Sequence, residues 1–297
     1  MTGIIIKALS GFYYVKTDTE IYTCKARGSF RKSGVSPLVG DRVEFTPMDD
    51  FTGTVEEILP RKTQLKRPPV ANIDKLFILS SFENPAPNTF VIDKLTVLAR
   101  HAGIEPIIVF NKSDMGDFGE FEKIYKNAGF KTFVLSALKG EGIEALKAEL
   151  KDSISAFTGN SGVGKSSVLN AVLGEDIIAT GDVSQKLGRG RHTTRHSEIY
   201  PLSFGGFVAD TPGFSSIESG DDYSLKENLV NCFWDFDDFK DDCRFASCSH
   251  TKEKDCAVIN AVENGRIEKT RWESYLEIHE ELKDLKDWQN KEKQRNK

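Results

Sequence analysis

A glycine-rich loop in the middle of the chain carries the residues best suited to hold the phosphates of a nucleotide. Residues 159–166 lie between a short segment of alternating polar and apolar residues, 153–157, and a segment with a helical pattern, 166–173. The glycines allow a tight turn whose backbone N–H groups point inward and cradle phosphates at a helix N-terminus. A lysine at the end of such a loop reaches the β- and γ-phosphates, and the serine after it is a ligand for Mg²⁺. The loop residues predicted to act in this way are Gly159, Asn160, Ser161, Gly162, Val163, Gly164, Lys165, Ser166 and Ser167, with Lys165 as the charge and Ser166 as the Mg²⁺ ligand.

A second motif, upstream in the chain, argues against a chance glycine-rich turn and identifies the base. The apolar run 107–110 predicts a strand buried on both faces, and residues 111–114 follow it, where open α/β sheets bind ligands. A carboxylate at Asp114 can accept from the N1–H and N2–H₂ of guanine, and adenine offers neither donor in that arrangement. We expect Asn111 to face the O6/N7 side of the base and the Ala137 N–H, after a strand at 132–135, to donate to O6. The residues predicted to bind guanine are Asn111, Lys112, Ser113, Asp114, Ser136 and Ala137.

Two further segments are predicted to respond to the γ-phosphate. Residues 210–213 end the apolar stretch that starts at Phe207, which places Asp210 to hold Mg²⁺ through water and the Gly213 N–H to sense the γ-phosphate. The glycine-rich, basic segment 188–195 occupies the place of the first switch of a GTPase. Either Thr193 or Thr194 is predicted to ligate Mg²⁺ when the γ-phosphate is present.

The residue that activates water is left open by the sequence. Phe214 stands where many small GTPases place the glutamine that orients the attacking water. Hydrolysis must therefore draw this group from elsewhere or run slowly. His192 is a candidate, because a titratable ring in a switch can orient water, and an exposed loop histidine without a catalytic role is the alternative.

The order of these motifs predicts a circular permutation. An ordinary GTPase opens with the phosphate loop and closes with the Asn-Lys-x-Asp element, whereas here the element at 111–114 precedes the loop at 159–166. Alternating strands and helices predict a doubly wound sheet, so the fold class is α/β. The strands are expected at 75–81, 107–110, 132–135 and 153–157, and the helices at 90–102, 118–128 and 141–151. The last of these helices runs directly into the phosphate-loop strand, which is the new join.

Three cysteines and a histidine near the C-terminus predict a structural zinc site. Cys243, Cys248, His250 and Cys256 lie within fourteen residues and supply the four ligands of a closed tetrahedral Zn²⁺ site. A set of unrelated thiols in a loop is the alternative. Cys24 and Cys232 lie outside this set and are expected to be core residues. A charged helix over residues 267–294 follows, whose apolar stripe is expected to pack against the rest of the protein.

The first 65 residues predict a small all-β barrel. Five short strands are expected at 3–9, 11–16, 20–26, 41–46 and 53–58, which suits an OB-fold, with an SH3-like barrel as the rival. Residues 1–67 carry eleven Lys and Arg against eight Asp and Glu, a local +3 that leaves −8 for the remainder of the chain. This basic bias favours nucleic-acid binding over a merely solvated face. The predicted RNA-binding residues are Lys25, Arg27, Phe30, Arg31 and Lys32.

Length and composition agree with a chain of several domains. The 297 residues carry a net charge of −5, and no segment is apolar enough to span a membrane or basic-then-apolar enough for a secretion signal. Five cysteines in a reducing cytoplasm indicate a metal site rather than disulfides. We expect a monomer with a barrel at residues 1–65, a GTPase domain at 66–217 and a zinc-binding helical domain at 218–297. A proline-marked, basic linker at 60–69 is expected to join the first two.

In this combination of parts the chain resembles the RsgA (YjeQ/YloQ) family of bacterial GTPases that act in biogenesis of the small ribosomal subunit. The resemblance covers essentially the whole chain and rests on the motifs quoted above, including residues 188–194. It implies a cytoplasmic GTP hydrolase that uses GTP, Mg²⁺ and one structural Zn²⁺. It further implies binding of the small subunit and its rRNA late in assembly, next to other assembly factors, with slow hydrolysis of GTP to GDP away from the ribosome.

Two other functional classes fit parts of the pattern. One is a P-loop ATPase or kinase, against which Asn111, Asp114 and Ala137 argue. The other is a zinc-containing RNA-binding regulator that uses GTP mainly as a conformational ligand. GTP turnover measured with and without small ribosomal subunits distinguishes this regulator from an enzyme.

Overall fold

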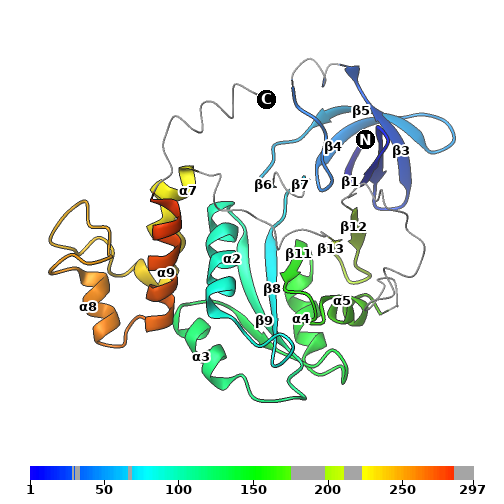
Figure 1. The fold of residues 1–297 in the computed structure, drawn as a ribbon. Helices are drawn as coiled ribbons and strands as arrows, with labels where there is room; N and C mark the ends of the chain where they lie inside the picture. The colour runs from blue at the N-terminus through cyan, green and yellow to red at the C-terminus, as the bar shows by residue number, and fades with distance from the viewer. Residues whose placement is uncertain (29, 31–33, 66–68, 175–197, 211–222, 284–297) are drawn as a thin grey trace.

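The computed structural model describes residues 1–28, 30, 34–65, 69–174, 198–210 and 223–283. Figure 1 shows a barrel, a central sheet flanked by helices, and a helical module arranged side by side. One sheet of eleven strands runs through the first two of these bodies, in the order β10-β9-β8-β11-β13-β12-β1-β2-β3-β5-β4. The barrel and the nucleotide-binding sheet are therefore continuous in their hydrogen bonding.

The N-terminal barrel has the strand order of an OB-fold. Its strands bury apolar side chains in a shared core, in which Ile5, Val15 and Cys24 are fully buried. The sheet closes on itself because β1 pairs with both β2 and β4, and β3 pairs with β5 in parallel. This five-stranded closure confirms the OB-fold over the SH3-like rival. The strands are β1 Thr2–Leu9, β2 Phe12–Lys16, β3 Ile21–Ala26, β4 Arg42–Pro47 and β5 Thr52–Ile58.

The segment between barrel and central sheet is a hydrogen-bonded junction, where the sequence predicts a linker. Two short strands, β6 Gln64–Leu65 and β7 Val70–Ala71, pair with each other. The Arg61 guanidinium donates from Nε and Nη2 to the two carboxylate oxygens of buried Asp41, both at 2.7 Å. Such a bidentate pair is strong and directional, so this side of the barrel is fixed.

The central sheet is doubly wound around the strand of the predicted phosphate loop. Five strands run parallel and β12 is antiparallel to β13. Successive residues of the central strands alternate between two cores, one covered by α2 and α3 and the other by α4 and α5. The strands are β8 Lys75–Ser81, β9 Glu105–Asn111, β10 Thr132–Val134, β11 Ile154–Gly159, β12 Glu198–Pro201 and β13 Phe207–Asp210. The helices are α2 Thr89–His101, α3 Gly119–Asn127, α4 Ile143–Leu150 and α5 Lys165–Leu173.

The strand order confirms the permutation. α4 ends at Leu150 and β11 begins at Ile154, so the helix after the predicted guanine motifs leads straight into the phosphate-loop strand. β12, which the sequence analysis did not anticipate, extends the sheet towards the barrel. β13 is the last strand of the sheet in the chain, and the next described element belongs to the C-terminal module.

The C-terminal module packs against the outer side of α2. Its core joins Val97 and Leu98 of α2 to Phe233, Tyr275 and other apolar residues of the module. Four residues of the predicted apolar stripe lie on α9: Tyr275 and Leu282 are buried, and Trp272 and Leu276 are partly buried. The expected packing is therefore confirmed over α9. The remaining two, Leu285 and Trp288, lie outside the described residues. The elements are α7 Tyr223–Asn228, η3 Leu229–Cys232, η4 Trp234–Phe236, α8 Ala257–Glu263 and α9 Lys269–Leu282.

A buried arginine fastens α9 to α2. Arg271 is fully buried, and it donates from Nη1 to Asp93 Oδ1 at 2.7 Å and from Nη2 to Asp235 Oδ1 at 2.9 Å. Burial alone would lower the pKa of Arg271, but the charges of Asp93 and Asp235 outweigh it and raise that pKa. The guanidinium also lies over the rings of Phe130 and Phe233, at 5.0 and 4.8 Å from their centroids. A charge so enclosed is stable only while its partners stay in place.

We predict that Arg271→Met destabilises the C-terminal module by about 3–5 kcal/mol, because it leaves Asp93 buried without its cation. Urea denaturation followed by tryptophan fluorescence measures this, since all three tryptophans lie beyond residue 230. Lys269→Met on the same helix is the matched control, because it removes an exposed pair with Glu273 that is 3.5 Å apart. Equal effects of the two substitutions would contradict the central role of the buried arginine.

Candidate functional site

The predicted phosphate and guanine motifs meet at one edge of the central sheet. The loop of residues 159–166 joins β11 to α5, and Asn111 is the last residue of β9. β9 and β11 both pair with β8 and run parallel to it, so their carboxyl ends lie on the same side. This is the edge at which open α/β sheets bind ligands.

The side chain of Asn111 ties three loops together. Its Nδ2 donates to the Val163 carbonyl at 2.9 Å, and its Oδ1 accepts from the Ala137 N–H at 3.1 Å. The side chain is buried, and its bond to Val163 is shielded from water, while the bond from Ala137 is part-buried. The sequence predicts that Asn111 and the Ala137 N–H contact the base directly. The structure shows both groups in bonds within the protein, which join the predicted phosphate loop to the loops predicted to hold guanine.

Gly164 is required by the close approach of Asn111. A Cβ at this position would lie 2.4 Å from Asn111 Nδ2, and the backbone φ is +88°. Directly after it, α5 begins without a side-chain cap, so the N–H groups of its first turn face the loop. Lys165 and Ser166 are half-buried in that first turn. The geometry is that of an anion site at a helix N-terminus.

Asp114 is held as an exposed carboxylate by a neighbouring motif residue. The Ser136 hydroxyl donates to Asp114 Oδ1 at 2.6 Å. This hydrogen bond is the main cause that lowers the pKa of Asp114, so the group stays ionised and able to accept from two donors. Lys112 Nζ donates to the carbonyls of Glu83 and Asn84, at 3.1 and 3.4 Å, beside the phosphate loop.

The Mg²⁺ and switch residues are only partly described. The backbone of Asp210 ends β13, whose neighbour Ala209 is in register with Ala156 of β11. Asp210 therefore ends a strand adjacent to the phosphate-loop strand. Four other predicted residues lie outside the described residues, namely His192, Thr193, Thr194 and Gly213. Phe214 also lies outside them.

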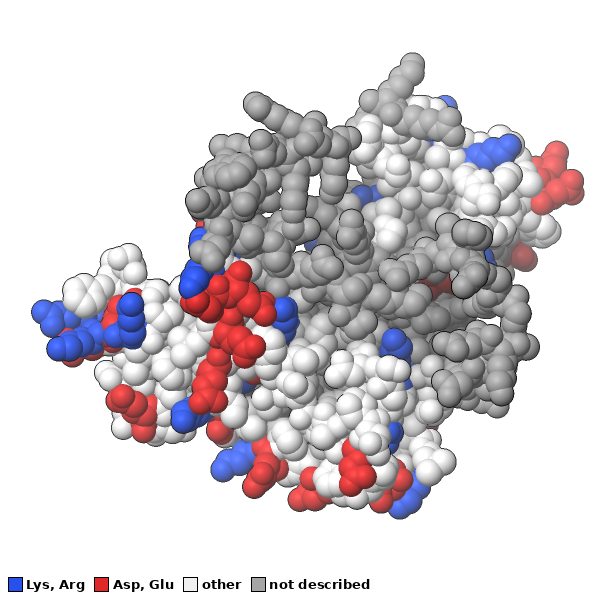
Figure 2. Space-filling model, in the orientation of Figure 1, with Lys and Arg blue, Asp and Glu red and all other residues white. Residues whose placement is uncertain are grey.

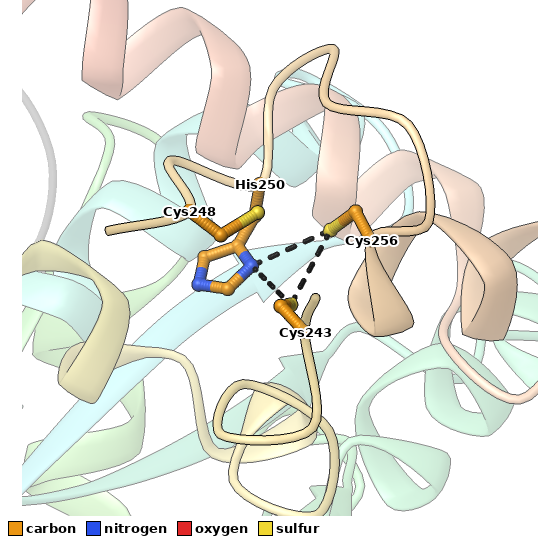
Figure 3. A group of neighbouring side chains, drawn as sticks. All are labelled: Cys243, Cys248, His250 and Cys256. Carbon is orange, nitrogen blue, oxygen red and sulfur yellow. Dashed lines mark hydrogen bonds between the residues drawn. The ribbon is translucent and has the colours of Figure 1, made fainter. Parts of the chain in front are cut away.

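The four predicted zinc ligands converge on one point (Figure 3). Their donor atoms all lie within 4.8 Å of one another. His250 Nδ1 lies 3.5 Å from the sulfurs of Cys243 and Cys256, which are 3.8 Å apart. Tetrahedral zinc with bonds of about 2.3 Å to sulfur and about 2.0 Å to nitrogen would space its ligands at about 3.8 Å and about 3.5 Å. Cys243, His250 and Cys256 therefore have the spacing of zinc ligands, with Cys248 close enough to be the fourth.

Three residues outside this set shape the loop that carries it. Glu253, which the sequence reading missed, accepts from the N–H and hydroxyl of Ser249 and from two further backbone N–H groups. Although its partial burial raises its pKa, these hydrogen bonds prevail and lower the pKa of Glu253 to about 2. Trp272 and Tyr275 of α9 donate to the carbonyls of His250 and Ser249 at 2.9 and 2.8 Å. The sequence offered one indication of this role, because Glu253 is an acidic residue midway between His250 and Cys256.

The predicted RNA-binding residues of the barrel separate into two groups. Lys25 and Arg27 are exposed, with Lys25 over the Phe12 ring at 5.2 Å and Arg27 paired with Glu56 at 2.6 Å. Phe30 is half-buried and packs against the hydrophobic core, which differs from the freely stacking ring that the sequence predicts. Arg31 and Lys32 lie outside the described residues. An additional exposed aromatic, Phe12, faces Lys25 across β2 and β3.

Among the described residues, no helix has both the length and the apolar character needed to cross a membrane. The expected core cysteines, Cys24 and Cys232, are both buried.

Family models match nearly the whole chain. The model described as RsgA GTPase matches residues 58–220, and the RsgA N-terminal domain matches residues 2–55. A model described as 50S ribosome-binding GTPase matches residues 154–294, which begin at the phosphate-loop strand.

Relatives and solved structures agree with these matches. The small ribosomal subunit biogenesis GTPase RsgA of Caldanaerobacter subterraneus subsp. tengcongensis is 47% identical over 285 residues, covering 95% of this chain and 96% of its own. The protein of the same name from Clostridium novyi is 44% identical, covering 95% and 97%. The crystal structure of YjeQ from Thermotoga maritima aligns with a TM-score of 0.81 at 36% identity, covering 96% of this chain and 99% of its own. YloQ, described as a circularly permuted GTPase, aligns with a TM-score of 0.80 at 34% identity over 96% of both chains. With its permuted sheet, its OB-fold and its Cys₃His cluster, this chain belongs to the RsgA family of circularly permuted GTPases.

Proposed function

We propose that this chain hydrolyses GTP to GDP and phosphate in the late maturation of the small (30S) ribosomal subunit, and that the subunit stimulates the reaction. The observation that carries this proposal is the Asn111 side chain, which joins the phosphate loop to the loops expected to hold guanine. A site so connected can sense the base and the phosphates together. The names of the relatives supply the small subunit as the partner.

The proposed division of labour follows three domains: a barrel at 1–65 for rRNA, a GTPase domain at 66–217 and a zinc-binding domain at 218–297. In the second, residues 159–167 hold the phosphates, Lys165 supplies positive charge, and Asp114 with Ser136 reads guanine. Ser166, Asp210 through water, and Thr193 or Thr194 would hold Mg²⁺, which neutralises charge that develops on the phosphates. His192 is the candidate for orienting water.

The zinc site is proposed to be structural. Cys243, Cys248, His250 and Cys256 would fill all four positions of a tetrahedral ion, which leaves none for a substrate. The indole and phenol of α9 then fix the carbonyls beside His250. A metal at this position would therefore hold the loop of residues 243–256 against α9.

The charge distribution supports rRNA binding by the barrel rather than by α9. Figure 2 shows acidic side chains gathered in a band over α9, whose exposed residues include Glu273, Glu277, Glu280 and Glu281. This face repels a polyanion. On the barrel, exposed Lys25 beside Phe12 pairs a phosphate-binding charge with a ring suited to stacking. We further propose that the chain acts as a monomer in the cytoplasm, where subunits assemble alongside other assembly factors.

GTP turnover in the presence of purified small ribosomal subunits tests the proposed function. We expect slow turnover by the protein alone, in keeping with Phe214 at the usual glutamine position, and turnover at least about tenfold faster with small subunits. Large subunits are the control for a general effect of ribosomal RNA. A regulator that uses GTP only as a conformational ligand would bind small subunits without any rise in turnover, and that result would replace the proposed function.

Asp114→Asn should shift the base preference from guanine towards xanthine. Loss of a charged acceptor is expected to weaken GTP binding by about 1.5–3 kcal/mol, and the new amide can donate to the xanthine C2 carbonyl. Fluorescent-nucleotide titrations with GTP and XTP measure the change. Asp117→Asn is the matched control, since this exposed carboxylate only accepts from the Gly119 N–H. Unchanged GTP affinity in the Asp114 variant would refute the base assignment.

Freshly purified protein should contain one zinc ion per chain, and Cys248→Ser should remove it and loosen the C-terminal module. Metal analysis by mass spectrometry and thermal melting report the two effects, while the preference for GTP over ATP should stay as in the wild type. Cys232→Ala serves as the control, because this buried thiol lies outside the cluster. Full zinc content in the Cys248 variant would show that the four residues are not the ligands.

A further inference from the structure

The barrel and the central sheet are joined edge to edge through β12. On one side β12 pairs antiparallel with β1, with Lys7 opposite Glu198, and on the other it pairs with β13, with Glu198 opposite Asp210. These three residues therefore form one row across three strands, and Figure 1 shows β12 between β13 and the barrel. Neighbouring strands lie about 4.8 Å apart, so the backbone of Lys7 is about 10 Å from that of Asp210.

A side-chain contact reinforces this row at the boundary. Lys7 Nζ donates to both carboxylate oxygens of Glu198, at 3.1 and 3.0 Å. The register of β1 against β2 shifts between Ile5 and Lys7, and such a bulge redirects the side chain next to it. The irregularity thus lies directly before Lys7, the residue of β1 that is in register with Glu198 of β12.

The position of the pair argues against a purely anchoring role. The barrel is already held by the junction, through the Arg61–Asp41 pair and the bond from Asn72 Nδ2 to the Gly40 carbonyl at 3.0 Å. Lys7 and Glu198 keep 35% and 30% of their side-chain surface exposed, and such an ion pair adds little stability. What the pair adds is a second connection, which joins β1 to the strand next to the end of β13 that carries Asp210.

We propose that the Lys7–Glu198 pair couples the OB-fold to the magnesium end of the nucleotide site. When the bound nucleotide changes, β13 and β12 shift, and the row transmits this shift to β1. Binding of RNA to the barrel is transmitted along the same row to the nucleotide site. Lys7 and Glu198 are positioning residues, because they act through the strand that ends at Asp210. The inference rests on the proposed function in taking Asp210 as a Mg²⁺ residue. Coupling between two sites is reciprocal, so nucleotide state must also be visible in the barrel.

Hydrogen exchange of the β1 amides measures this coupling in the full-length protein without ribosomes. Exchange is compared between GDP and a non-hydrolysable GTP analogue, each with Mg²⁺. The variants are Lys7→Met and Glu198→Gln, which remove the pair from either side, and the double variant Lys7→Glu/Glu198→Lys, which reverses it. Lys126→Met is the matched control, since it removes an ion pair with Glu122 inside α3, 2.8 Å in length. Melting temperatures establish that each variant is folded.

In the wild type and the Lys126 control, we expect exchange at β1 to differ between the two nucleotides by about fivefold or more. Each single variant should lose this difference, and the reversed pair should restore it. The coupling is disproved by a wild type without the difference, by single variants that keep it, or by a folded reversed pair that does not restore it. Failure of small subunits to stimulate turnover would instead count against the proposed function, because exchange at β1 is measured without them.

Discussion

The nucleotide-binding edge of this molecule depends on one side-chain amide. The buried side chain of Asn111 donates to the carbonyl of Val163 and accepts from the N–H of Ala137. Its donor lies so close to residue 164 that only glycine fits there, and glycine in turn permits the turn that opens α5. The predicted phosphate loop and the loops predicted to hold guanine are therefore joined by one side chain. Because a low-dielectric setting strengthens such bonds and makes their loss costly, one residue keeps the two halves of the site in register.

The permutation changes what surrounds that site. In the sheet, β11 keeps its central place between β8 and β13, so the core does not depend on where the chain begins. What changes is the attachment of the segment after β13, which leads to the C-terminal module rather than to the next strand of the sheet. That module is secured to α2 by Arg271, with Asp93 on one side and Asp235 on the other. A buried ion pair is weak evidence for stability, but it restricts the relative position of the elements that carry it. Displacement of either partner would leave a buried charge without its counter-ion.

The barrel is attached in a different way, by hydrogen bonding at two places. The junction holds it through Arg61 and Asp41, and β12 continues the sheet into β1. A barrel on a flexible linker would sample many orientations, whereas this one shares its backbone ladder with the nucleotide-binding sheet. The three bodies are thus arranged around a common sheet and helix, with an acidic face over α9 and exposed basic and aromatic side chains on the barrel.

The sequence by itself determined the parts that depend on local pattern. The alternation of apolar residues placed the barrel strands and β8 within a few residues of their observed bounds, since burial of one or both faces leaves a period that can be read directly. Motif order specified the permutation, and the spacing of Cys243, Cys248, His250 and Cys256 was enough to predict their convergence. Only the tertiary structure decided the rest: that Arg271 is buried, that Asn111 binds loops, that Phe30 packs inward, and that Lys7 meets Glu198. Each of these contacts joins residues far apart in the chain, and no local sequence pattern predicts the partner of a polar side chain. Packing determines the partner, because it removes water and leaves one geometry in which the charges and hydrogen bonds are satisfied.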